Sequence, residues 1–270
     1  AMERPEGAGL RNVGEGIYVD PDLTAKDVAE IRRLVAHARK RVAAFYGDSR
    51  QRPKIIFCDS DDCYSGFGAI GSGFSDGKNV VISPSGRCEA VIAHELAHVE
   101  LSGRLGGLEH VIDKVPQWFD EGQAVFISGA EEFNEQNWLA ATDNGQQAPS
   151  LDELRSVDNW NRVNGRHGEG MQLTYGTAMR EMARWFKRAG NKGLVRLLEA
   201  LRHNERFELA YARLENAAPP AEAASAQSPA PADSPPSAET VAHAEATHPW
   251  AGTARPKVDG PMEPKGRATF

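Results

Sequence analysis

The chain has 270 residues, 40% of them hydrophobic, which is enough for one sizeable core and a small second one. Its formal net charge is -7 at pH 7 and no run of Lys and Arg stands out, so we expect no nucleic-acid partner. No apolar stretch approaches the ~20 residues of a transmembrane helix, so we expect no membrane span. The opening AMERPEGAGL lacks the charged and apolar regions of a signal peptide, and we expect a trimmed start.

The first predicted elements are a strand and a long helix. We expect residues 1–16 to form a flexible N-terminal segment, followed by a short strand, IYVD, at Ile17–Asp20. Thr24 has an acidic residue, Asp27, three positions on, which is typical of a capped helix start. Gly47 marks the expected end of this helix.

Two buried strands are predicted next, PKIIFC at Pro53–Cys58 and NVVIS at Asn79–Ser83. The link between them contains Gly66-Phe-Gly-Ala-Ile-Gly71, which fits the pattern G-x-G-x-x-G. A dinucleotide site requires a strand directly before these glycines and a helix directly after them. Here the strand ends about eight residues earlier and SGFSDGKN follows, so we interpret the link as a flexible loop or hairpin.

The sequence contains three cysteines, which are too few for a disulfide framework. Cys58 and Cys63 flank the acidic CDSDDC segment, and a bridge between them is possible in an oxidising compartment. The alternatives are three buried thiols, Cys88 included, or a structural zinc site that lacks a fourth ligand at useful spacing. We favour the bridge, and with it a cell-envelope (periplasmic) or secreted protein.

Helical sequence dominates the rest of the chain. We expect a helix from about Arg87 to Leu101 that ends at Gly103, and another that starts at Pro116. Later helices are expected at 151–155, 174–189, 193–202 and 205–215. Of the 24 residues 217–240, 19 are Ala, Pro or Ser, a composition that cannot build a core.

The predicted fold class is therefore α+β, with a small mixed sheet packed on the Arg87–Leu101 helix and a helical C-terminal part. We expect a division into residues 1–16, an α/β subdomain at 17–130, a helical subdomain at 131–216 and an Ala/Pro/Ser-rich tail or linker at 217–270.

The sequence VIAHELAHVEL contains His94, Glu95 and His98 in the order H-E-x-x-H. Histidines four residues apart project from one face of a helix and can bind the same ion, while the adjacent carboxylate can face a water on that ion. Apolar residues surround all three, and buried imidazoles and carboxylates need partners, which a cation supplies. We therefore predict a metal site.

Two histidines do not complete a catalytic zinc site, which usually has three protein ligands. The pattern H-E-x-x-H-x-x-G-x-x-H is absent, because positions 101 and 104 are Leu and Arg. From the residues alone, the third ligand remains open among His110, Asp113, Asp120, Glu121, His167 and Glu169.

The segment PQWFDEGQA, Pro116–Ala124, resembles the W-x-x-E-G-x-A helix that follows H-E-x-x-H in gluzincins, the thermolysin-like and aminopeptidase-N-like zinc peptidases. It is closer still to the bacterial peptidase-MA-like families that carry P-x-W-F-x-E-G. The resemblance covers about Val80–Ile127 well. It implies a zincin-like fold and a Zn2+ cofactor, with the ligands His94, His98 and Glu121.

The resemblance also implies that Glu95 is the general base of a peptidase that uses a metal-activated water. The family commonly steadies the oxyanion with a Tyr or His, for which Tyr175 and His167 are the candidates. In this family the strand beside the cleft pairs with the substrate, and KNVVIS is the expected strand. Asp120 is expected to support the site without binding the metal.

The implied substrate is a peptide or protein. The aminopeptidase motif G-x-M-E-N is absent, so an endopeptidase is the preferred prediction. The alternatives are a non-catalytic zincin-like module that binds metal or peptide, and a peptidase regulated by its own C-terminal tail. The sequence leaves the oligomeric state open.

Overall fold

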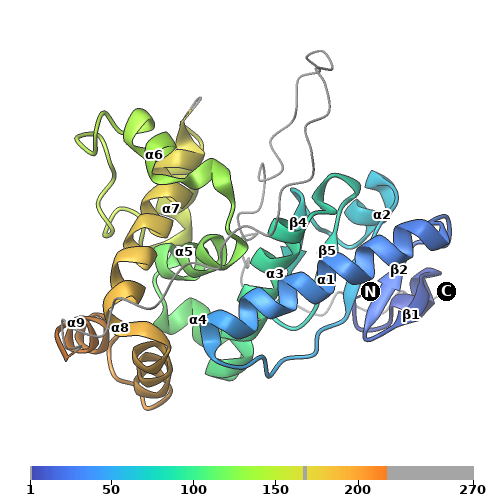
Figure 1. Ribbon diagram of the computed structural model, residues 1–270, viewed down its shortest axis with the longest axis horizontal. Helices are drawn as coiled ribbons and strands as arrows, with labels where there is room; N and C mark the ends of the chain where they lie inside the picture. The colour runs from blue at the N-terminus through green and yellow to red at the C-terminus, as the bar shows by residue number, and fades with distance from the viewer. Residues whose placement is uncertain (1, 167–168, 218–270) are drawn as a thin grey trace, which may run out of the picture.

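The computed structural model describes residues 2–166 and 169–217. The N-terminal half of the chain is built on a mixed β-sheet (Figure 1). The strand order across the sheet is β1-β2-β3-β5-β4. The three inner strands β2, β3 and β5 are parallel, whereas β1 and β4 pair antiparallel at the two edges. The strand bounds are Arg11–Gly14 (β1), Ile17–Val19 (β2), Ile55–Phe57 (β3), Gly73–Ser75 (β4) and Val80–Ile82 (β5).

The two faces of the sheet are covered differently. Side chains alternate between faces along a strand. In β3, Ile55 and Phe57 therefore join the main core, whereas Ile56 packs in a smaller cluster with Cys58 and Tyr64. Two long helices cover the main-core face and one short helix lies on the other side; their bounds are Ala25–Tyr46 (α1), Glu89–Leu105 (α3) and Asp61–Gly66 (α2).

The start of α1 follows the predicted capping pattern. The hydroxyl of Thr24 accepts a hydrogen bond from the backbone N–H of Asp27, and the Asp27 carboxylate accepts one from the backbone N–H of Thr24. Gly47 ends the helix in the left-handed conformation. The segment 1–16, which we expected to be flexible, contains a 3-10 turn (η1, Pro5–Ala8) and β1, which pairs with β2.

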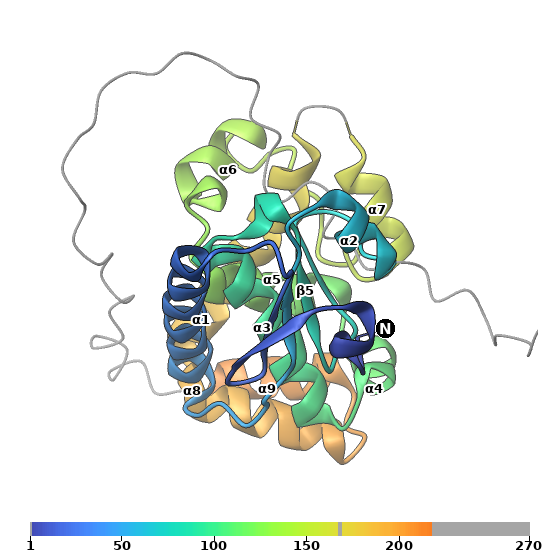
Figure 2. The same cartoon turned by 90° about the vertical axis from the view of Figure 1, so that its right-hand side faces the viewer.

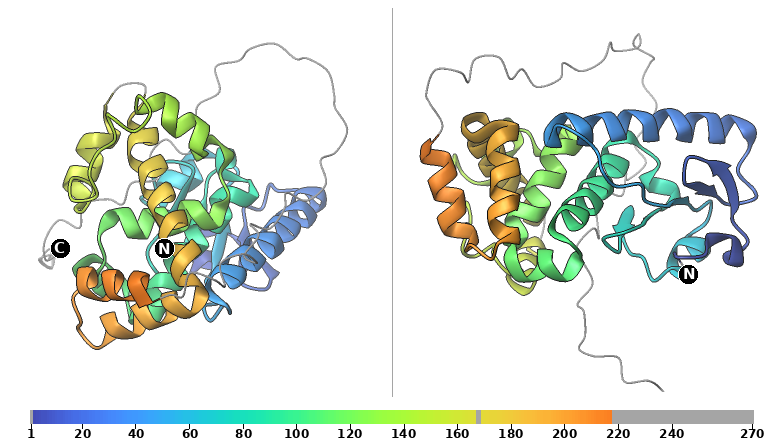
Figure 3. Two further views of the ribbon diagram at one scale, coloured as in Figure 1. Left: turned by 60° about the vertical axis from the view of Figure 1, so that its left-hand side comes forward. Right: turned by 90° about the horizontal axis from the view of Figure 1, so that it is seen from below.

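The C-terminal half of the described chain is helical and lies beside the half that contains the sheet. The helix α1 runs alongside both halves (Figure 3). Short 3-10 turns lie at Pro84–Gly86 (η2) and Glu131–Phe133 (η3). The helices are α4 (Leu108–Lys114), α5 (Gln117–Ser128), α6 (Glu135–Ala141), α7 (Val157–Asn164), a π-helical turn η4 (Gln172–Gly176), α8 (Thr177–Arg202) and α9 (Phe207–Ala217). The predicted α+β class, a small mixed sheet followed by a helical part, is confirmed.

Several predicted boundaries are corrected by the structure. The segment 151–155 forms turns, and the helices expected at 174–189 and 193–202 are one helix, α8, interrupted at Gly190 (φ 59°). The helix α3 passes through Gly103 and ends at Gly106. Gly103 serves packing instead, because a Cβ there would lie 2.1 Å from the Cδ of Gln51.

The predicted bridge between Cys58 and Cys63 is present, and Cys88 is a free thiol. No helix in the described part of the chain combines the length and apolar character needed to cross a bilayer. The segment Gly66–Gly71 begins at the end of the helix α2 and precedes the hairpin of β4 and β5, so it lacks the preceding strand and following helix of a dinucleotide loop. Beyond Ala217, the predicted tail lies outside the described residues.

Candidate metal centre

The helix α3 carries the two histidines and Glu95 into the interior. It packs against α1 and α5, with β4 across its first half, and α3 and α5 lie side by side in the middle of the molecule (Figure 2). The exposed fractions of His94, Glu95 and His98 are 0%, 3% and 5%. These three titratable groups are therefore part of a protein interior, where unpaired polar groups are costly.

The helix α5 brings the third acidic group to the same place. Pro116 precedes its first turn, and Trp118 and Phe119 anchor it among the rings of α9, with Phe207 5.7 Å and 5.1 Å from them between ring centroids. Gly122 permits close contact with α8, because a Cβ at this position would lie 2.6 Å from the carbonyl oxygen of Ala178. This packing holds Glu121 against α3 with no exposed surface.

The side chains of His94, His98 and Glu121 form one compact group whose ligand atoms all lie within 4.8 Å of one another. Oε2 of Glu121 is 3.4 Å from Nε2 of His94 and 3.7 Å from Nε2 of His98, and the two Nε2 atoms are 3.1 Å apart. Zinc ligands at about 2.0–2.1 Å in tetrahedral geometry are separated by about 3.3 Å. The three atoms therefore have the spacing that a single ion requires.

The protonation chemistry of the group also suits a cation. Burial lowers the pKa of His94 below its usual value, although the neighbouring Glu121 carboxylate acts in the opposite direction. Low pKa favours the neutral imidazole, which is the form that binds metals. Oε2 of Glu121 is buried and accepts no hydrogen bond from the described residues. A metal ion between this oxygen and the two neutral imidazoles would give it a positively charged partner.

Two polar side chains of α5 support His98 and Glu121, two of the candidate metal ligands. Oδ1 of Asp120 lies 2.8 Å from Nδ1 of His98, so this carboxylate can hold the ring with Nε2 directed to the metal position. The amide Nε2 of Gln117 donates a hydrogen bond of 2.9 Å to Oε1 of Glu121. Asp120 thus has the supporting position that we expected. The contact of Gln117 was missed, although its position four residues before Glu121 places both on one helix face.

The edge strand β4 lies directly against Glu95. A Cβ on Gly73 would be 2.7 Å from Cγ and 2.8 Å from Oε1 of Glu95, so a larger residue at this position would displace the Glu95 side chain. The strand beside the site is therefore Gly73–Ser75. The expected strand, KNVVIS, is wrong for this role, because β5 (Val80–Ile82) pairs with β3 on one side and β4 on the other and has no open edge.

Of the two residues expected to stabilise the oxyanion, only Tyr175 is among the described residues. Tyr175 lies in the π-helical turn η4, fully buried, with its ring centroid 6.3 Å from that of His94. Its ring also contacts Trp160 and Phe133, at 5.0 Å and 5.4 Å between centroids. Tyr175 is thus beside the candidate metal centre, and its catalytic role stays a prediction. His167 lies outside the described residues.

Among the described residues, the other candidates for a third ligand are not part of the group. Within residues 2–166 and 169–217, the metal-binding geometry is found only for His94, His98 and Glu121. His110 and Asp113 lie on α4, and Glu169 is exposed. Glu121 is therefore the residue that the fold brings to the two histidines.

Comparison with known proteins adds no relative. No protein-family model matches the chain, and no curated protein matches it in sequence. The mixed sheet, the helix α3 and the buried His-His-Glu group at the spacing H-E-x-x-H followed by E are consistent with a zincin-like fold.

Proposed function

We propose that this protein is a zinc-dependent peptidase of the gluzincin type. The observation that carries the proposal is the buried group of His94, His98 and Glu121, together with Glu95 on the next position of the same helix. A site that only binds a metal has no need of a carboxylate beside the ligands, whereas hydrolysis needs a base at that place. The choice of zinc rests on the ligand set, two imidazoles and a carboxylate, which is common in catalytic zinc sites.

The residues divide the chemistry between them. His94, His98 and Glu121 would hold the ion, which when bound supplies Lewis-acid polarisation and lowers the pKa of water to about 7. Glu95 accepts the proton of the attacking water and later delivers it to the leaving amine. We assign the stabilisation of the developing negative oxygen to Tyr175 or His167, either of which can donate a hydrogen bond to an oxyanion.

The substrate that we propose is a peptide in extended conformation. The strand β4 is a sheet edge, so its outer backbone groups can pair with a peptide main chain, as in strand addition. Because Gly73 of β4 lies against Glu95, a peptide on this edge would pass directly by the general base. Internal cleavage is the preferred mode, since no amine-anchoring G-x-M-E-N motif is present.

The main experiment combines metal analysis with turnover of casein and of a peptide mixture. The unmodified protein should contain one zinc per chain and cleave peptides, including peptides blocked at the N-terminus. Glu95→Gln should abolish cleavage and keep zinc, whereas Glu121→Ala should lose zinc. Full activity of Glu95→Gln would refute the mechanism, and a zinc-loaded wild type without turnover would favour the alternative of a binding module.

The cellular location and regulation are further parts of the proposal. The disulfide between Cys58 and Cys63 favours an oxidising compartment, so we propose the cell envelope or the outside of the cell. Regulation by the tail would appear as a change of activity when residues 217–270 are removed, and equal rates would exclude it.

A further inference from the structure

The carboxylate of Glu121 has two oxygens in different environments. Oε2 faces Nε2 of His94 and of His98, at 3.4 Å and 3.7 Å, and accepts no hydrogen bond from the described residues. Oε1 accepts the hydrogen bond of 2.9 Å from the amide of Gln117. The neutral amide of Gln117 thus holds Oε1, while Oε2 faces the two imidazoles.

The position of Gln117 is itself fixed by the backbone. Its N–H donates to the carbonyl oxygen of Arg155 at 2.8 Å, and the N–H of Trp118 donates to the carbonyl oxygen of Leu154 at 3.1 Å. These bonds attach the first turn of α5 to the segment before α7. Gln117 is 5% exposed, so its amide has little room to turn away from Glu121.

We propose that Gln117 is a positioning residue that occupies Oε1 of Glu121, so that Glu121 binds the metal through Oε2 alone. This inference rests on the proposed function. A carboxylate that binds through one oxygen contributes one ligand atom, and with two imidazoles this leaves the fourth position of a tetrahedral zinc open for water. Gln117 suits this task because its amide donates a hydrogen bond without adding a charge or competing for the cation.

The test removes the donor and leaves the ligand in place. Gln117→Met replaces the amide by an apolar chain of similar length, and Gln117→Asn keeps an amide that is one methylene too short. Gln117 borders a cavity of about 710 Å³, which water can use to fill the gap in the shorter variant, so Gln117→Asn is expected to fold. We expect both variants to bind zinc about 10–100-fold more weakly, as is typical when a group that orients a ligand is lost.

Gln123 provides a matched control on the same helix. It is also buried, with its amide donating to the carbonyl oxygen of Asp120 at 3.1 Å and accepting from the hydroxyl of Tyr46 at 3.0 Å. Its amide has no hydrogen bond to a ligand side chain. Gln123→Met should therefore lower stability but leave zinc affinity, measured by competition with a chelator, at the wild-type value.

X-ray absorption at the zinc edge gives a readout that a merely structural role would not change. The wild type should show one carboxylate oxygen on the metal, and the two Gln117 variants should show two. Wild-type affinity and an unchanged spectrum in Gln117→Asn would overturn the inference while the proposed function stands, and so would two carboxylate oxygens in the wild type. A wild-type protein that binds no zinc would overturn the proposed function, and this inference with it.

Discussion

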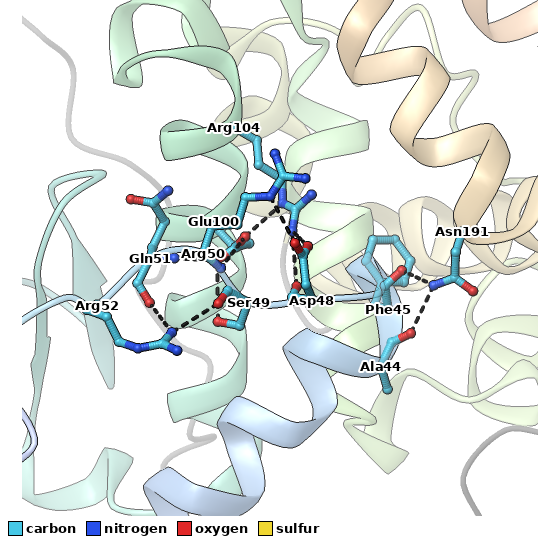
Figure 4. Close-up of polar contacts among 10 residues, drawn as sticks. All are labelled: Ala44, Phe45, Asp48, Ser49, Arg50, Gln51, Arg52, Glu100, Arg104 and Asn191. Carbon is cyan, nitrogen blue, oxygen red and sulfur yellow. Dashed lines mark hydrogen bonds and ion pairs between the residues drawn. The ribbon is translucent and has the colours of Figure 1, made fainter.

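Replacement of Glu100 should destabilise the helix α3 without changing the His94, His98 and Glu121 group. This residue lies on α3 two positions after His98, about 200° round the helix, and points away from the metal side. Glu100 is 1% exposed, and its carboxylate accepts hydrogen bonds from the backbone N–H groups of Arg50 and Gln51, each at 3.1 Å, and from Nε of Arg104 at 2.7 Å (Figure 4).

We expect Glu100→Ala to lower the free energy of unfolding by about 3–5 kcal/mol, the usual loss when one member of a buried ion pair is removed. The change leaves Arg104 buried with only Asp48 as a carboxylate partner, and leaves two backbone N–H groups without their acceptor. Since small proteins have a total stability of about 5–15 kcal/mol, this loss is large.

Urea unfolding at 25 °C measures the difference, with Glu30→Ala as the control. Glu30 also pairs with an arginine, Arg33, but both side chains are 53% exposed, and such pairs contribute about 0–1 kcal/mol. A loss in Glu100→Ala no larger than in Glu30→Ala would refute the reasoning that this carboxylate fastens the segment 48–52 to α3.

Three further outcomes are expected. Removing zinc with a chelator should lower the thermal midpoint by roughly 5–10 °C when free zinc had been about 100 times its Kd, and an equal midpoint in both states would contradict metal binding. Gly73→Ala should reduce kcat at least tenfold with zinc retained, because its Cβ would crowd Glu95, whereas Gly66→Ala, where a Cβ meets nothing, should not. The hydrogen bond from Arg184 lowers the pKa of Glu215, so this group stabilises the fold above its unfolded pKa of about 4.3 and loses that effect as the pH falls. In Glu215→Gln the thermal midpoint should therefore fall less steeply than in the wild type between pH 5 and pH 3. Identical slopes in the two proteins would contradict a stabilising contact between Arg184 and Glu215.

The sequence predicted the parts of the site that depend on local periodicity. His94 and His98 are four residues apart on a helix, so their convergence follows from helix geometry and needed no tertiary information. Glu121 is different, because the residues alone left several acids and histidines as candidates. The resemblance implied Glu121, and the packing of α5 on α3 and α8 brings it to the two histidines.

The errors also have a common physical origin. The strand Val80–Ile82 is apolar at every position, which is expected of an inner strand, but whether a strand lies inside a sheet or at its edge depends on its neighbours. The edge strand Gly73–Ser75 contains a glycine and has weak strand character, so no local pattern indicated that it would lie beside Glu95. Gly103 has the appearance of a helix end, but α3 continues to Leu105 and the end of the Gln51 side chain lies against Gly103.

The contacts around α3 bear on whether the metal is needed for folding. The metal side of the helix is held by the contact of His98 with Asp120 and by that of Glu121 with Gln117, and the opposite side by Glu100. None of these contacts requires an ion, and the surrounding core is continuous from the sheet to α8. The site is therefore largely preformed, so metal should raise the stability of a folded protein and not create the fold, unlike small zinc domains that are unfolded without metal. An apoprotein that has lost its near-ultraviolet circular dichroism at 25 °C would contradict this argument.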